Sequence, residues 1–287
     1  MAPVVAVINL KGGVGKTTTS VALAEMLASE HGKRVLVVDL DPQTNATVML
    51  IGEAAWLERN RRGATVASLF RRAIEPTAPP FDLNRCIHAG ASDVESAHRL
   101  DLLPSSLDLI DLQDRLVTAS ARRFGVHSLV EILRRAIRPR LADYDLVLVD
   151  CPPHLGLVTL NGLRIADAYL IPTIPDVLST YGIAPITKRV SDFASSIGGR
   201  IEPLGIVATK WRAGVKVHQA TLERLRADAA AGRGPPVFET VVPEAADLAA
   251  AAEFVTAGRT LAQKYKGARE PYAALAREVL RALDARA

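Results

Sequence analysis

Short apolar runs rich in valine, isoleucine and leucine recur along this chain and alternate with stretches of helical spacing. The runs lie at residues 4–8, 35–39, 146–150, 168–173 and 204–209. Continuous apolar runs of this length are typical of strands buried on both faces of a parallel sheet. We therefore expect an α/β fold with a doubly wound, mostly parallel sheet flanked by helices, and active residues at the carboxyl ends of its strands.

The pattern changes between residues 52 and 143. Residues 76–80, Pro-Thr-Ala-Pro-Pro, indicate a loop, and residues 107–117 and 128–137 have helical spacing. Neither an internal repeat nor a long low-complexity segment divides the chain. We therefore expect a single domain over residues 1–287, with a mostly helical elaboration at about 52–143.

Composition narrows the class of protein. The chain has 287 residues, of which 49% are hydrophobic and 23% charged, enough to bury a substantial core. Its two cysteines, Cys86 and Cys151, are too few for a disulfide framework and lack metal-ligand spacing, so we expect reduced thiols. The sequence shows neither a signal peptide nor an apolar run of about 18 residues. A cytoplasmic protein is expected.

A glycine-rich segment directly follows the first apolar run. It consists of Lys11, Gly12, Gly13, Val14, Gly15, Lys16, Thr17 and Thr18. Glycines let the backbone curl so that its N–H groups face phosphate oxygens, which a Cβ would obstruct. Lys16 would reach the β- and γ-phosphates, Thr17 would offer a hydroxyl to Mg²⁺, and the start of the following helix would attract the anion. The segment predicts a nucleotide-binding P-loop.

The loop departs from the strict motif G-x-x-x-x-G-K-[ST], because Leu10 stands where the first glycine is expected. The Lys-Gly-Gly-x-Gly-Lys-Thr pattern resembles instead the deviant Walker A box of the ParA/Soj/MinD group of P-loop ATPases. The resemblance spans nearly the whole chain. It implies ATP and Mg²⁺ as cofactors and an ATP-dependent homodimer, in which Lys11 reaches the phosphates of the other subunit.

Two acids follow the second apolar run. Asp39 and Asp41 are two residues apart, so in an extended segment both side chains project from the same face. The resemblance implies that Asp41 orients the hydrolytic water and that Asp39 supports the Mg²⁺ shell. One alternative is an Asx turn that caps the next helix. A Rossmann dinucleotide site, with Asp39 on a ribose, is a further rival, but Thr18 occupies the place of its third glycine.

The apolar run at residues 146–150 also ends in an acid, Asp150, and is a credible Walker B segment. Asp150 would hold Mg²⁺ through water. The resemblance implies that Pro152 and Pro153, with the segment that starts at His154, form a switch that senses the γ-phosphate, as the Asp-Cys-Pro-Pro motif does in the family. The plainer interpretation is that Cys151 is buried and inert and that His154 is a surface residue of the loop.

Two late segments match the family in position. Lys210 follows the run at 204–209, and Pro243 ends the sequence Val-Val-Pro, which in relatives lies near the adenine. The resemblance therefore implies that both contact the nucleotide. Relatives often carry an arginine shortly after this proline, whereas this chain has Glu244.

The resemblance implies an ATPase switch for DNA partition. Its ATP-bound dimer would bind DNA without sequence preference, and a ParB-type adaptor would stimulate the slow hydrolysis that releases it. A formal net charge of +4 agrees with binding to phosphates. The candidate DNA-binding residues are Lys188, Arg189, Arg212, Lys216, Arg224 and Arg226. The alternative is that these cations only keep the surface hydrated and bind no DNA. If the protein does bind DNA, it would be associated with the nucleoid.

Other functions of the same family remain possible. A MinD-like membrane-surface ATPase would need an amphipathic C-terminal helix, and Tyr272, Leu275, Val279 and Leu283 recur at helical spacing. We expect this stripe to pack on the core, so membrane binding is not expected. A positioning ATPase for a protein cargo is a second alternative. An iron–sulfur ATPase is disfavoured because the two cysteines are poorly placed to share a cluster.

Overall fold

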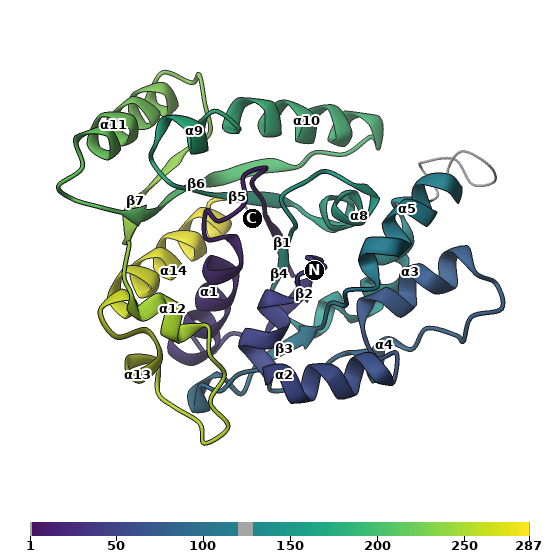
Figure 1. Cartoon of the computed structure of the whole chain (residues 1–287). Helices are drawn as coiled ribbons and strands as arrows, with labels where there is room; N and C mark the ends of the chain where they lie inside the picture. Colours follow the sequence, from purple (N-terminus) through teal and green to yellow (C-terminus); the bar gives the residue numbers. More distant parts are fainter. Residues whose placement is uncertain (1, 120–128, 287) are drawn as a thin grey trace.

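The computed structural model describes residues 2–119 and 129–286, and these contain a seven-stranded sheet. The strands are β1 (Val4–Val7), β2 (Val35–Asp39), β3 (Leu100–Leu103), β4 (Leu146–Asp150), β5 (Ala168–Thr173), β6 (Glu202–Trp211) and β7 (Val237–Pro243). They lie in the order β3-β2-β4-β1-β5-β6-β7, and each pairing between neighbours is parallel (Figure 1). The predicted α/β fold with a doubly wound sheet is confirmed.

The apolar runs locate five of these strands. The bounds of β2, β4 and β5 are those of the predicted runs, and β1 ends one residue early, at Val7. The sixth strand, β6, extends beyond the run at 204–209 in both directions. Its first residue, Glu202, pairs with β5 and its last, Trp211, pairs with β7, so pairing on two sides lengthens it.

Two strands have no counterpart among the predicted runs. The first, β3, lies inside the segment expected to be mostly helical and adds an edge to the main sheet beside β2. The second, β7, forms the opposite edge beside β6. Edge strands are paired on one side only, so their sequences need less apolar character than those of central strands.

Helices cover both faces of the sheet. They are α1 (Lys16–Glu30), α2 (Asn45–Arg61), α3 (Val66–Ile74), α4 (Leu83–Cys86), α5 (Leu109–Ala119), α7 (Ile132–Ile137), α8 (Leu157–Ile165), α9 (Val177–Thr180), α10 (Ile183–Ser196), α11 (Lys216–Ala230), α12 (Asp247–Ala251), α13 (Leu261–Tyr265) and α14 (Arg269–Asp284). The helix expected at 107–117 is α5. That expected at 128–137 corresponds to the shorter α7, and its first residue, Ser128, lies outside the described residues.

Alternate residues of the strands face two buried cores, as the pleat requires. On β1, Val4 and Ala6 join a core that includes side chains of α3, α5, α7, α8 and α10. Val5 and Val7 join the other, which includes side chains of α1 and α14. Figure 1 shows α1 and α14 together on one side of the sheet, with α8 on the other. The central strands are therefore buried on both faces.

The C-terminal stripe belongs to the second core. Tyr272, Leu275 and Val279 of α14 are each 1% exposed or less, and Leu283 is half-buried. Helix α14 contacts α1 and β7. The stripe therefore packs on the protein, as expected, and its apolar surface is already covered.

Candidate nucleotide-binding site

The P-loop connects β1 to α1 at the carboxyl edge of the sheet. Gly13 and Gly15 have φ angles of 76° and 83°, in the left-handed region that favours glycine. A Cβ added at Gly12 or Gly13 would have no atom within 4 Å, so this part of the loop faces open space. Thr209 of β6 supports the loop from behind, since its hydroxyl donates a hydrogen bond of 2.8 Å to the carbonyl of Val14. The loop is therefore open to solvent at Gly12 and Gly13 and is anchored to β6 at Val14.

Asn9 fixes the start of this cradle. Its Nδ2 donates a hydrogen bond of 2.8 Å to the carbonyl of Pro172 in β5, and its Oδ1 accepts one of 3.0 Å from the amide of Lys11. Both partners satisfy a side chain that is wholly buried. Asn9 therefore ties the loop to the neighbouring strand, a role that the sequence alone did not indicate.

Lys16 is the buried cation of the site. Only 6% of it is exposed, and its Nζ donates a hydrogen bond of 3.1 Å to the carbonyl of Lys11. Burial lowers the pKa of Lys16, while the nearby Asp150 and Asp41 favour its charged form. A partly desolvated ammonium at the mouth of a glycine cradle suits an anionic phosphate. Lys11 itself is half-buried at the start of the loop.

Asp150 is held by two hydroxyls of α1. Thr17 donates a hydrogen bond of 2.8 Å to its Oδ2, and Ser20 donates one of 2.8 Å to its Oδ1. Complete burial raises the pKa of Asp150 to about 6, although both hydrogen bonds oppose this shift. The carboxylate lies behind Thr17, where it can orient the hydroxyl and the water of a metal ion. Hydroxyl and carboxylate oxygens are ligands that Mg²⁺ prefers, so these residues fit that ion.

Asp39 and Asp41 differ in their access to the cleft. The carboxylate of Asp39 is fully buried and accepts hydrogen bonds from the amide of Asp41 at 3.0 Å and from the amide and hydroxyl of Thr47 at 2.9 and 2.7 Å. Burial, and then the charge of Asp150, raise the pKa of Asp39 well above its usual value. Asp41 accepts a hydrogen bond of 2.9 Å from the amide of Gln43 and faces the cleft. The Asx turn considered above is therefore present, and it orders the loop that carries Asp41.

These elements surround a cleft of about 480 Å³. Its lining residues are Gly12, Gly13, Gly15, Lys16, Thr17, Thr18, Asp41, Gln43, Asn45, Val48, Met49, Pro153, Lys210 and Ala252. The structure thus brings most of the candidate P-loop residues together with Asp41 and Lys210. Pro243 is absent from this lining and lies at the end of β7, paired with Trp211. Lys210 has a φ of 50° and lies within β6, where the pairing of this strand with β7 shifts its register.

Sequence reasoning missed one wall of the cleft. Val48 and Met49 come from α2, and Ala252 follows α12, so this wall joins segments far apart in the chain. It adds apolar surface to a cleft whose lining also includes charged residues. For Val48 and Met49 the sequence did offer a signal, because both belong to the helix α2 that begins shortly after Asp41. For Ala252 the sequence offered no signal, because only tertiary packing brings this residue to the cleft.

The segment after β4 contributes one residue to the cleft. Pro153 lines it, and the carbonyl of His154 accepts a hydrogen bond of 2.7 Å from the hydroxyl of Thr159 in α8. Cys151 is wholly buried, and burial raises its pKa far above the usual value of a thiol. Cys86 is also buried, at the end of α4. Two buried thiols in these positions do not suit a cluster shared with a second subunit.

The candidate DNA-binding residues lie on and around α10 and α11. Lys188 and Arg189 are on α10, Lys216, Arg224 and Arg226 are on α11, and Arg212 directly follows β6. Lys188 forms an ion pair with Asp192, Arg212 forms one with Glu244, and Arg226 donates a hydrogen bond to the carbonyl of Glu239. The other three cations have neither kind of contact within the described part of the chain. The structure gathers these charges on neighbouring helices without bringing all six to one point.

Comparisons with known proteins agree with this geometry. The AAA domain family profile matches residues 2–202. The chromosome partitioning protein ParA of Myxococcus xanthus is 31% identical over 280 residues, which cover 97% of this chain and 88% of that protein. The chromosome-partitioning ATPase Soj of Thermus thermophilus is 34% identical over 259 residues, which cover 90% of this chain and 87% of that protein. Within the described residues, the longest helices are too short or too polar to cross a bilayer.

Solved structures have the same fold. One of cobyrinic acid a,c-diamide synthase from Mycobacterium smegmatis, with bound ADP and magnesium, matches with a TM-score of 0.73 and 27% identity over 99% of this chain and 96% of the other. An ATP complex of a McdA variant from Cyanothece matches with a TM-score of 0.71 and 19% identity over 99% and 96% of the two chains, and this likeness concerns the fold alone. Because partition ATPases match this chain at 31% and 34% identity over most of both sequences, the chain belongs to the ParA-type family of P-loop ATPases.

Proposed function

We propose that the chain is an ATP-hydrolysing switch for DNA segregation. An ATP-bound homodimer binds DNA without sequence preference, and a ParB-type adaptor stimulates an otherwise slow hydrolysis that releases the DNA. The observation that carries the proposal is the convergence of Lys16, Thr17 and Asp41 on one cleft. Relatives that are named for chromosome partitioning, at 31% and 34% identity, support DNA as the cargo.

Phosphoryl transfer to water depends mainly on positioning and on electrostatic stabilisation. The P-loop amides and Lys16 would hold the phosphates, and Lys16 would stabilise the charge that develops on them. Thr17 would hold Mg²⁺ directly, with Asp150 acting through their 2.8 Å hydrogen bond. Bound Mg²⁺ neutralises charge on the transferred phosphate. Asp41 is the residue that would orient the attacking water, because its carboxylate lines the cleft whereas that of Asp39 is occupied by hydrogen bonds.

Exposed apolar side chains beside the P-loop support a homodimer. Val177 and Leu178 of α9 are 58% and 76% exposed, and Tyr181, directly after this helix, is 81% exposed. Helix α9 follows β5, at the same edge of the sheet as the P-loop. Adjacent large apolar side chains in water mark an interaction surface. A second copy that covers them when ATP is bound would bring Lys11 close to the partner's phosphates.

Exposed cations on α10 and α11 support binding to DNA. Arg189 and Lys216 are exposed, and the hydrogen bonds and ion pairs of the described residues involve neither of their side chains. Such side chains can exchange water for phosphate at little cost. The membrane-surface alternative is less favoured, because the apolar stripe of α14 is buried.

The test is binding to a random-sequence DNA duplex with ATP, with ADP and without nucleotide, across a salt series. We expect binding only with ATP, a steep loss with salt, and no binding by Lys16→Ala, which lacks the phosphate contact. The matched surface variant Lys216→Glu should retain ATP and lose affinity for DNA. If the protein binds no DNA with ATP, with ADP or without nucleotide, the proposed role in DNA segregation is wrong. A membrane surface or a protein assembly would then be the remaining candidate for its binding partner.

A further inference from the structure

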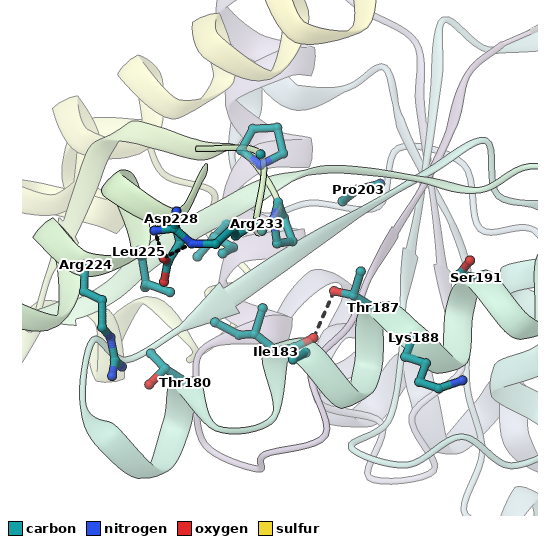
Figure 2. Close-up of a pocket in the computed structure, with 16 residues that line it drawn as sticks. Thr180, Ile183, Thr187, Lys188, Ser191, Pro203, Arg224, Leu225, Asp228 and Arg233 are labelled. Carbon is teal, nitrogen blue, oxygen red and sulfur yellow. Dashed lines mark hydrogen bonds and ion pairs between the residues drawn. The ribbon is translucent and has the colours of Figure 1, made fainter. Parts of the chain in front are cut away.

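A second groove lies between α10, α11, β6 and the loop at residues 232–236 (Figure 2). Its volume is about 720 Å³, and its lining shares no residue with the nucleotide cleft. Figure 2 shows Ile183, Thr187, Lys188 and Ser191 along α10 on one side of it. None of the proposed steps of ATP hydrolysis uses this groove.

The floor of the groove is apolar. Ile183 and Ile206 are 6% and 1% exposed, and Leu225 of α11 packs half-buried against the same core. Pro235 and Pro236 close the side formed by the loop. The hydroxyl of Thr187 is occupied, because it donates a hydrogen bond of 2.9 Å to the carbonyl of Ile183. A recess of this kind accepts an apolar side chain and gains free energy by removing it from water.

The rim of the groove is basic. It carries Lys188, Arg224 and Arg233, against a single acid, Asp228. Arg233 and Asp228 neutralise each other in an ion pair of 2.6 Å. Lys188 contacts Asp192 at 2.8 Å, but both side chains are largely exposed, so the pair is weak and a ligand can replace it. The side chain of Arg224 is exposed and forms no ion pair or hydrogen bond within the ranges that the structure describes. Two cations are therefore available to an anionic ligand.

We propose that this groove binds an acidic peptide segment of a partner protein. An apolar side chain of the peptide occupies the recess over Ile183 and Leu225, and flanking carboxylates pair with Lys188 and Arg224. The basic rim favours an acidic ligand by charge complementarity. The apolar floor favours a peptide over DNA, because an apolar recess has no group that binds phosphate. A second copy of this chain fits less well, because an isologous contact would set the basic rim against itself.

The experiment uses a display library of random 12-residue peptides, selected on the wild-type chain without nucleotide. Selected peptides are synthesised, and their affinities are measured by fluorescence anisotropy for the wild type, Ala184→Trp and Arg224→Glu. Ala184 is an exposed helical residue of the groove, so a tryptophan there fills the recess without changing the charge. We expect peptides that combine Asp or Glu with a large apolar residue, and affinities at least about tenfold weaker for both variants.

The matched control is Arg189→Glu, which makes the same charge change on an exposed residue of α10 outside the groove lining. It should leave peptide affinity within about twofold of the wild type. Circular dichroism and thermal unfolding verify that each variant folds. Peptides that bind Ala184→Trp as well as the wild type, or that lack acidic residues, would overturn the proposal.

Two further readouts identify a different occupant. If Ala184→Trp weakens ATP-dependent binding to a random DNA duplex, the groove contacts DNA and the proposal is wrong. If it changes the mass measured by light scattering, the groove is an interface between copies, which also overturns the proposal. Because peptide selection needs neither nucleotide nor DNA, its result is independent of the proposed switch.

Discussion

The hydroxyl of Thr17 donates a hydrogen bond of 2.8 Å to Oδ2 of Asp150, a residue 133 positions later in the chain. The contact joins the first residues of α1 to the carboxyl end of β4, and β4 pairs directly with β1. The buried acid thus contacts a residue of the cleft lining without lining the cleft itself. In the proposed site, Thr17 would touch Mg²⁺ and Asp150 would act through the Thr17 hydroxyl, so substitution can separate their effects.

Thr17→Ala removes a hydroxyl of the cleft lining, whereas Ser20→Ala removes one outside this lining, whose partners are Asp150 and the carbonyl of Lys16. We expect Thr17→Ala to weaken Mg²⁺-dependent ATP binding by about 100-fold and Ser20→Ala by about tenfold, since the second residue acts through Asp150. Thr17→Ser retains the hydroxyl and is the control. Titration of a fluorescent ATP analogue with Mg²⁺ or EDTA measures this. Equal affinities for Thr17→Ala and the wild type in Mg²⁺ would contradict the assignment.

Asp41→Ala should bind ATP and fail to hydrolyse it. The carboxylate lines the cleft and is the proposed water-orienting group, so its loss should lower the hydrolysis rate by about 10²–10⁴-fold. Phosphate release and filter binding of ATP report the two properties separately. The comparison is Asp39→Ala, which removes an acceptor for Thr47 and should instead destabilise the fold. Normal turnover by folded Asp41→Ala would exclude the water-orienting role.

Leu178→Glu should weaken the proposed ATP-dependent dimer and leave the monomer intact. Leu178 is 76% exposed beside the P-loop, so a charge there costs the folded chain little but opposes burial at an interface. Light scattering with ATP, in an Asp41→Ala background that prevents hydrolysis, measures the dimer. The matched control is Leu57→Glu, at an exposed position near the far end of α2. If both variants dimerise equally, the surface around α9 is not the interface.

The sequence was informative where local pattern decides structure. The apolar runs locate β2 and β4 with their terminal acids, and the glycine pattern locates the cradle, because both depend on neighbouring residues. Long-range contacts decide the rest. The apolar wall at Val48 and Ala252, and the support of Val14 by Thr209, depend on which strands and helices meet in space. The short edge strand β3 was missed for a similar reason, since its pairing with β2 stabilises it more than its own four residues do.

Lys264→Met should destabilise the fold strongly. Lys264 is fully buried, and its Nζ lies 2.6 Å from Glu25 of α1 and 2.8 Å from Asp93. Without the lysine, two buried carboxylates lose a shared cation, which costs about 3–5 kcal/mol in the free energy of unfolding. Lys188→Met breaks an exposed ion pair and should cost about 1 kcal/mol or less. Urea denaturation compares the two variants, and similar losses would show that the buried cluster is not a stabilising network.

His88 should make stability depend on pH. Burial, and then the charge of Arg59, lower the pKa of His88, whose Nδ1 accepts a hydrogen bond of 2.8 Å from Nε of Arg59. The unfolded chain, with a histidine pKa of about 6.5, therefore binds more protons than the folded chain just below that pH. The contribution of neutral His88 is complete above about pH 6.5 and is lost as the pH falls through the lowered folded-state pKa.

His88→Gln should reduce this loss, because glutamine can accept the hydrogen bond from Arg59 and does not titrate. Urea denaturation of both proteins at pH 7.5 and 5.5 gives the change in the free energy of unfolding. We expect a smaller decrease on acidification for the variant than for the wild type. An equal decrease in the two proteins would mean that other groups carry the pH dependence and that protonation of His88 does not oppose folding.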